Sequence, residues 1–167
     1  MGYTTDFSGR ITVVPPLTQA EIDYLNKFAR SRRMDRTKGP YFVDGSDGNF
    51  GSGQGHDPDI RDYNRPPQGQ PGLWCQWVPT EDGTAIEWDG GEKFYESEEW
   101  MRYLIEHFLK PGAWTKQKAN PVCPVRFGDH VCNGVIEAAG EDLNDRWALI
   151  VNDNRVSRKN GRIVYDE

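Results

Sequence analysis

The sequence predicts a single α+β domain over residues 1–167, built in two layers, with one antiparallel sheet and two helices packed on the same face of it. Three observations point to this fold class. The 167 residues match the usual size of one domain. Apolar residues recur at helical spacing in two segments, whereas the other apolar segments are short, rich in β-branched or aromatic residues, and bounded by turn-forming residues. An antiparallel sheet with helices on one side is the simplest packing for these segments in their order along the chain.

The chain opens with a strand that leads into the first helix. Residues 3–14 are rich in Thr, Val, Ile and aromatic residues and stop at a Pro-Pro pair, which is typical of a strand followed by a helix start. Thr18 and Glu21 then form a capping box, in which each side chain accepts a hydrogen bond from the backbone N–H of the other residue. We expect this helix to end near Arg33, where basic side chains suit the negative end of the helix dipole. A phosphate-contacting patch is the alternative for this basic cluster, which consists of Arg30, Arg32, Arg33, Arg36 and Lys38.

Residues 39–72 have a different composition, with eight Gly and five Pro among 34 residues. This composition predicts a long mobile loop between the first helix and the second strand. The Gly-rich run 51–55 resembles a phosphate-binding loop, but it lacks the preceding strand and the following helix that such a loop requires. We therefore interpret it as part of the flexible loop.

The middle of the chain predicts a hairpin and a second helix. Residues 73–78 and 84–88 form two short strands around a turn at residues 81–83. In the first strand, apolar residues occupy both alternating sets of positions, so one tryptophan could stay accessible to solvent. A turn at residues 89–91 leads through residues 92–95 into the second helix, whose first turn contains Glu96, Glu98 and Glu99. We expect this helix to end at about Leu109, before a Pro-Gly pair.

The last third predicts an irregular connector over residues 111–128 followed by two hairpins. Their strands are rich in β-branched residues and are separated by an acidic turn and by a Lys-Asn-Gly turn at residues 159–161. Asn-Gly favours a tight type I′ turn, so we place the final hairpin around it. The four predicted strands cover residues 130–140, 146–153, 155–158 and 162–165.

Composition and charge exclude several classes of protein. The net charge of −6 is uneven, because residues 1–40 sum to +3 and residues 41–110 to −9. Without a basic field, extended nucleic-acid binding is not expected. No apolar stretch is long enough for a membrane span, and the first residues lack the layout of a signal peptide. Three Cys residues without framework spacing suit a reducing compartment, so we expect a cytoplasmic protein.

Several groupings were weighed as chemical sites. Cys123, His130 and Cys132 are residue types that bind zinc, but the paired spacing of a zinc site is missing, and we interpret the cysteines as buried thiols. The Asp residues of the long loop lack the spacing of a calcium loop. We therefore expect no metal and no cofactor. Carboxylates near Glu92 and Asp145 could divide acid and base roles, which keeps a hydrolase as an alternative.

One aromatic and cationic grouping predicts a ligand site. Its rings surround the central hairpin, and its cations come from the end of that hairpin and from a later one. Aromatic faces with nearby cations are what stack a nucleobase and hold its phosphate. Packing of the same rings in the core is the alternative. The predicted ligand-binding residues are Trp74, Trp77, Trp88, Lys93, Tyr95 and Arg146.

Four sequence motifs carry a resemblance to a known family. They are MGYTTDFSG, GLWCQWVPT, WDGGEKFY and GEDLNDRW. With these motifs the chain resembles a family of small proteins encoded by bacteriophages and by bacteria, often actinobacteria. The resemblance spans most of the chain outside residues 36–70 and 111–128. It implies a phage-linked setting in a bacterial host and assigns no catalytic residue.

These observations lead to three functional hypotheses. The first is a non-catalytic binding protein that captures a small anionic or nucleotide-derived ligand. The second is an inhibitor or adaptor that binds a host protein through the acidic second helix or the Gly-rich loop. The third is a hydrolase that uses Glu92 and the carboxylates of residues 141–145. The sequence leaves the oligomeric state, including a homo-oligomer, open.

Overall fold

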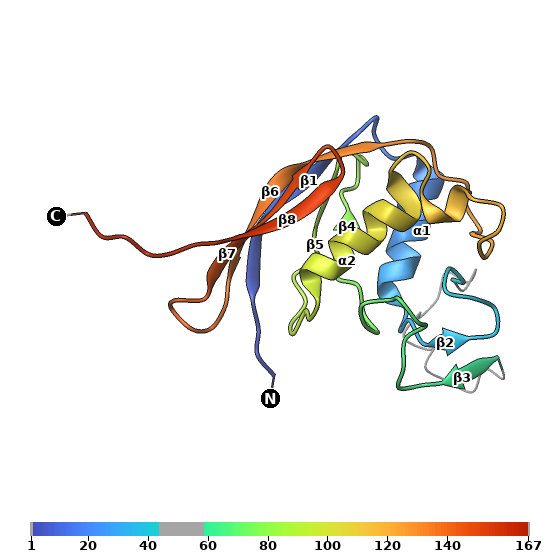
Figure 1. Cartoon of the computed structure of the whole chain (residues 1–167), viewed down its shortest axis with the longest axis horizontal. Coiled ribbons are helices and arrows are strands. Elements are labelled where there is room, and N and C mark those ends of the chain that lie inside the picture. The colour runs from blue at the N-terminus through green and yellow to red at the C-terminus, as the bar shows by residue number, and fades with distance from the viewer. Residues whose placement is uncertain (1, 44–58, 167) are drawn as a thin grey trace.

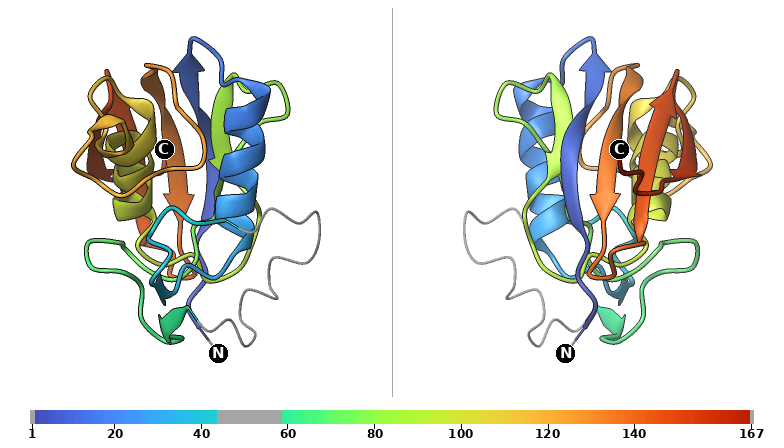
Figure 2. Two further views of the ribbon diagram at one scale, coloured as in Figure 1. Left: turned by 90° about the vertical axis from the view of Figure 1, so that its right-hand side faces the viewer. Right: turned by 90° about the vertical axis from the view of Figure 1, so that its left-hand side faces the viewer.

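The computed structural model describes residues 2–43 and 59–166. Six strands form one antiparallel sheet in the order β4-β5-β1-β6-β7-β8, and two short strands form a separate ladder. Both helices cover the same face of the large sheet, and the opposite face carries no helix in the described residues (Figures 1 and 2). The predicted α+β class with an antiparallel sheet is therefore confirmed.

The helices and strands follow one another along the chain in a mixed order. The elements are, in chain order, β1 (Asp6–Val14), α1 (Gln19–Arg30), β2 (Asp35–Arg36), β3 (Ile60–Asp62), β4 (Trp77–Pro79), β5 (Ala85–Trp88), α2 (Ser97–Leu104), a π-helical turn (Ile105–Leu109), a 3-10 turn (Trp114–Lys116), β6 (Val131–Ala139), β7 (Arg146–Asn152) and β8 (Arg155–Asn160). The longest run of paired residues in the sheet joins β1 to β6, where all nine residues of β1 have a partner. These two strands form the centre of the fold.

The predicted capping box starts α1. The N–H of Glu21 donates to Thr18 Oγ1 at 3.2 Å, and the N–H of Thr18 donates to Glu21 Oε1 at 2.7 Å. The helix ends at Arg30, earlier than predicted, because the chain turns inward after it. Arg33 is buried, with its guanidinium 4.0 Å from the centre of the Phe28 ring and a hydrogen bond of 2.6 Å to the Pro40 carbonyl. This part of the basic cluster is structural and is closed to a phosphate.

The loop predicted over residues 39–72 is partly wrong. Ile60–Asp62 forms β3, which pairs with β2 immediately after the first helix. Gln70 anchors the segment that follows, because its Nε2 donates to the carbonyls of Arg33 and Gly72, both at 2.7 Å. The ladder was missed because it is very short and joins residues distant in sequence. Residues 44–58, on which the prediction of mobility also falls, lie outside the described residues.

The central hairpin has the predicted turn but a shorter first strand. β4 begins only at Trp77, and the Leu73 carbonyl, in the predicted strand, instead accepts a hydrogen bond of 2.7 Å from the Arg33 N–H after α1. Gly83 closes the turn with a φ of 75°, and a Cβ at this position would lie 2.6 Å from the Leu17 carbonyl oxygen. Only glycine fits this conformation and this contact.

The second helix begins within one residue of the predicted start and ends where predicted. Lys93 and Glu96 have φ values of 58° and 59°, which a right-handed helix cannot contain, so α2 starts at Ser97. The helix continues through the π-helical turn to Leu109. The loop before α2 is held by Phe94, whose side chain is buried in the core.

The turn of the C-terminal hairpin lies at a different position from the predicted one. The turn lies at Asp153 and Asn154, with φ values of 46° and 69°, and residues 159 and 160 belong to β8. Asp and Asn tolerate this left-handed conformation, and the Asn154 side chain fastens the turn to β6: Oδ1 accepts from the Cys132 N–H at 2.7 Å, and Nδ2 donates to the His130 carbonyl at 3.0 Å. These contacts outweigh the local Asn-Gly signal, and residues 162–166 form no strand.

This turn yields a stability prediction. We expect Asn154→Ala to lower the free energy of unfolding by about 2–3 kcal/mol, because it removes two hydrogen bonds and puts alanine in a left-handed conformation. The matched control is Asn160→Ala in exposed β8, which should change stability by less than about 0.5 kcal/mol. Urea unfolding of both variants measures the difference. If both variants lost the same unfolding free energy, the assignment of the turn to Asp153 and Asn154 would be contradicted.

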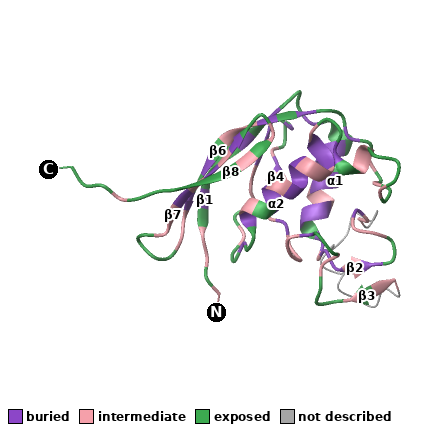
Figure 3. Ribbon diagram, in the orientation of Figure 1, coloured by how far each residue is buried: buried purple, intermediate pink, exposed green. Residues whose placement is uncertain are grey.

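The core lies between the helices and the inner face of the sheet. Buried residues concentrate there, on both helices and on alternate positions of the strands (Figure 3). Phe28 of α1 packs edge-on against Trp100 of α2 at 5.9 Å and against Phe108 at 5.4 Å between ring centres. Among the described residues, no helix has the length and apolar character needed to cross a membrane.

Candidate functional site

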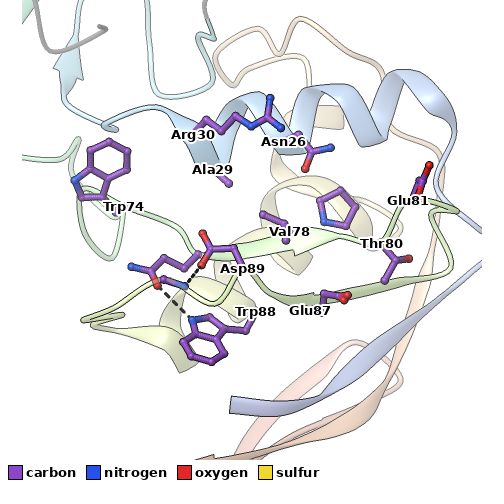
Figure 4. Close-up of a pocket in the computed structure, with 13 residues that line it drawn as sticks. Asn26, Ala29, Arg30, Trp74, Val78, Thr80, Glu81, Glu87, Trp88 and Asp89 are labelled. Atoms are coloured by element: carbon purple, nitrogen blue, oxygen red, sulfur yellow. Dashed lines mark hydrogen bonds between the residues drawn. The ribbon is translucent and has the colours of Figure 1, made fainter. Parts of the chain in front are cut away.

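Two of the predicted tryptophans converge on a groove between α1 and the β4–β5 hairpin. This groove, called the Trp groove below, encloses about 650 Å³. Residues of α1 line one side, and residues from the hairpin and its flanking segments line the other (Figure 4). The lining consists of Asn26, Ala29, Arg30, Trp74, Gln76, Val78, Pro79, Thr80, Glu81, Glu87, Trp88, Asp89 and Gly91.

The two walls follow from the local structure. Asn26, Ala29 and Arg30 are three and four residues apart, so they share one face of α1. On the other side, β4 is the edge strand of the sheet. Its Pro79 has no N–H to offer, so this edge is a poor template for an added strand. The groove is therefore suited to a small ligand or a side chain.

Trp88 is held in a defined position at one end of the Trp groove. Its Nε1 donates to Gln76 Oε1 at 3.3 Å, and Gln76 Nε2 in turn donates to the Glu92 carbonyl at 2.9 Å. On its inner side the indole packs edge-on against Phe7 at 5.5 Å. Trp74, from the segment before β4, is half-buried at the same end of the groove. The aromatic surface is therefore largely preformed.

Carboxylates dominate the charge of the Trp groove. Glu81, Glu87 and Asp89 line it, and Arg30 is the only cation among the described lining residues, while Glu87 also lies 3.8 Å from Nη2 of Arg10 outside the groove. Burial raises the pKa of the Asp89 carboxyl above its ordinary value, although the Gly91 N–H donates to its Oδ1 at 2.7 Å. A partly desolvated carboxylate favours N–H donors or a positive group and opposes a ligand with several negative charges.

The assignment of Trp77 to the ligand site is wrong. Its side chain is 1% exposed and belongs to the core. The indole Nε1 donates to the Ser97 carbonyl at 2.8 Å, and the ring packs edge-on against Phe7 and Phe94. Trp77 lies in β4 and is buried in the core, whereas Trp74 lies before the strand and lines the groove.

The three other predicted residues lie outside the Trp groove. Lys93 is exposed on the left-handed loop before α2. Tyr95, 55% exposed, lines a separate hollow with Asp145. Arg146 is held at the β6–β7 turn, where its Nη1 donates to the carbonyls of Asp142 and Asp145, both at 3.2 Å. Of the six predicted residues, the groove brings together only Trp74 and Trp88.

Sequence reasoning missed the polar residues that complete the Trp groove. The sequence pattern places Arg30 in the basic cluster at the helix end, and Asn26, Gln76 and Asp89 belong to none of the predicted sites. One signal was present: Asn26 and Arg30 stand four residues apart, on the polar side of an amphipathic helix. The closeness of α1 to β4 could not be inferred, because residues 31–76 separate them along the chain.

The carboxylates proposed for hydrolysis have structural contacts. Asp145 Oδ2 accepts from the Tyr3 hydroxyl at 2.7 Å, and Glu141 Oε1 accepts from the Thr4 N–H at 2.9 Å. They fix the N-terminal segment to the β6–β7 turn. Asp145 lines the hollow that contains Tyr95, and Glu92 is not among the residues lining that hollow. Glu92 and Asp145, the carboxylates proposed as a pair, therefore do not share this hollow.

The cysteines are buried or partly buried free thiols. Cys75 and Cys132 are buried, Cys123 is half-buried, and all three are free thiols. Burial raises the pKa of both Cys75 and Cys132 to about 12, so neither is a ready thiolate. Within residues 2–43 and 59–166, no three His, Cys, Asp or Glu side chains are grouped so that they could hold a metal ion.

Comparison with protein-family models, with curated proteins and with solved structures gave no match. The resemblance to phage-encoded proteins therefore stays an expectation that these comparisons do not test.

Proposed function

We propose that the protein is a non-catalytic binding protein that captures a small planar ligand in the Trp groove, a nucleobase-type ring with N–H donors. The observation that carries the proposal is the meeting of Trp74, Trp88 and the partly desolvated Asp89 carboxylate in one groove. An aromatic ring can stack on an indole, and its amino groups can donate to the carboxylate. The family resemblance supplies the proposed setting, a phage-linked protein inside a bacterial host.

The charge of the Trp groove narrows the class of ligand. Arg30 can meet one phosphate, but Glu81, Glu87 and Asp89 would repel further negative charge. A nucleoside or a nucleoside monophosphate therefore fits better than a triphosphate. The sequence predicts a small anionic or nucleotide-derived ligand. The charge of the groove favours, within that class, a ligand that is recognised mainly through its ring.

Calorimetric titration with guanosine, cytidine, their monophosphates and their triphosphates tests the proposal. We expect at least one nucleoside to bind, and its triphosphate to bind more weakly. Trp74→Ala should weaken binding about tenfold or more, because a stacked base contributes roughly 1–3 kcal/mol. Asp89→Asn should weaken binding of the nucleosides, since an amide accepts less strongly from N–H donors.

The matched control is Trp114→Ala, which removes an indole that is 51% exposed and lies outside the Trp groove. It should leave the affinity unchanged. The proposal fails if folded wild-type protein binds none of these compounds, or if Trp114→Ala weakens binding as much as Trp74→Ala does.

A further inference from the structure

The connector between the helices and β6 folds into a second hollow. It encloses about 650 Å³, and every residue that lines it comes from residues 115–129. It therefore shares no residue with the Trp groove. In the fold this segment follows the π-helical turn and lies beside the helices (Figure 1). We call this hollow, which is lined by residues 115–129, the connector pocket.

Hydrogen bonds fix the base of the connector pocket. The Lys116 ammonium donates to the carbonyls of Lys110 and Gly128 at 2.8 and 2.9 Å and to Asp129 Oδ1 at 2.9 Å. It thus ties the end of the helical segment to the end of the connector. Asn120 Nδ2 donates to the Trp114 carbonyl at 3.0 Å and closes the loop from inside. The irregular segment has a defined shape despite its lack of strands.

Two cations of the connector pocket have no counter-charge. Lys118 and Arg126 line it, and within the described part of the chain neither makes an ion pair or a side-chain hydrogen bond. The single carboxylate of the lining, Asp129, is already bound to Lys116. A concave surface with two uncompensated cations concentrates anions, even on a chain whose net charge is −6.

The lining also contains apolar surface. Val122 is almost fully exposed and Val125 is partly buried, so hydrophobic side chains stand beside the cations. We propose that the connector pocket binds an organic phosphate monoester, with Lys118 and Arg126 on the phosphate and the valines against the organic part. A phosphate monoester carries nearly two negative charges at neutral pH, which matches the two cations, and Arg suits phosphate geometry.

Phenyl phosphate is the probe that tests this proposal, in titrations followed by NMR at low ionic strength. We expect saturable shifts centred on residues 115–129, with tighter binding than inorganic phosphate, which lacks the ring, and than benzyl alcohol, which lacks the charge. Arg126→Gln and Lys118→Gln should each weaken binding about five- to tenfold, because each removes a charge-assisted contact. Raising the salt concentration should weaken it further.

Two controls separate this site from general charge effects and from the Trp groove. Lys159→Gln removes an exposed cation on β8 and should leave binding unchanged. Trp74→Ala should also leave the binding of phenyl phosphate unchanged. The connector pocket is therefore tested independently of the proposed nucleobase site. An unchanged affinity in the Lys118→Gln, Arg126→Gln double variant, or an equal loss in Lys159→Gln, would overturn the assignment.

Discussion

Replacing Trp77 by alanine is expected to lower the free energy of unfolding by about 3–5 kcal/mol, the loss typical of a large buried aromatic side chain. The side chain is 1% exposed, its Nε1 bonds the Ser97 carbonyl at 2.8 Å, and its ring lies 5.1 Å from Phe7 and 5.0 Å from Phe94, centre to centre. The substitution therefore leaves a cavity and removes the hydrogen bond that joins the indole to the start of α2. Chemical denaturation of the variant measures the loss.

Trp74→Ala is the matched control for this prediction. The two tryptophans are three residues apart, but Trp74 is only half-buried and lines the Trp groove. Its removal should lower the free energy of unfolding by less than about 1 kcal/mol, the usual size of changes outside the core. If Trp74→Ala proved as destabilising as Trp77→Ala, the division of these rings between core and groove would be wrong.

The second large effect is expected at a buried pair, Glu21 and His130. His130 Nδ1 lies 2.7 Å from the Pro15 carbonyl oxygen and Nε2 lies 3.0 Å from Glu21 Oε2. A carbonyl only accepts, and Glu21 Oε2 also accepts from the Gly128 N–H at 2.8 Å. Both ring nitrogens therefore face acceptors, so the geometry fits an imidazolium paired with a carboxylate.

We expect Glu21→Gln to lower the free energy of unfolding by about 3 kcal/mol at neutral pH. Glutamine keeps the capping-box position, but the charge opposite His130 is lost inside the protein, and breaking a buried pair typically costs about 3–5 kcal/mol. Glu137→Gln, on the exposed side of β6, removes the same charge from the surface and should cost less than about 0.5 kcal/mol. Urea unfolding at neutral pH compares the two variants.

The Glu21–His130 pair also makes the free energy of unfolding depend on pH. Burial opposes ionisation of Glu21, but the Thr18 N–H, the His130 ring and the Gly128 N–H outweigh it and lower the pKa of Glu21 below its ordinary value. A lowered folded pKa gives stability that is complete above the unfolded pKa, about 4.3, and is lost as the pH falls through the folded value. The stability difference between wild type and Glu21→Gln should therefore shrink at acid pH. A difference that stays constant from about pH 6 to about pH 2 would contradict this assignment.

Part of the candidate site could be predicted from the sequence. Alternation in residues 73–78 separates Cys75 and Trp77 from Trp74, Gln76 and Val78, and the structure buries the first set and gives the second to the Trp groove. This alternation is local information, but apolar residues stand on both sets of positions, and residues 73–76 lie outside β4. The other wall of the Trp groove belongs to α1, and nothing in the sequence indicates how close the two segments come.

The sequence by itself determined both helices, most strands of the large sheet and the capping box of α1, because these depend on hydrophobic period and on contacts a few residues apart. Only the tertiary structure decided where the last turn lies, that Arg33 points inward, and which side chains share a groove. Each of these depends on contacts between distant segments, such as Asn154 with β6. Such contacts outweigh local preferences because they satisfy buried polar groups that would otherwise be unpaired.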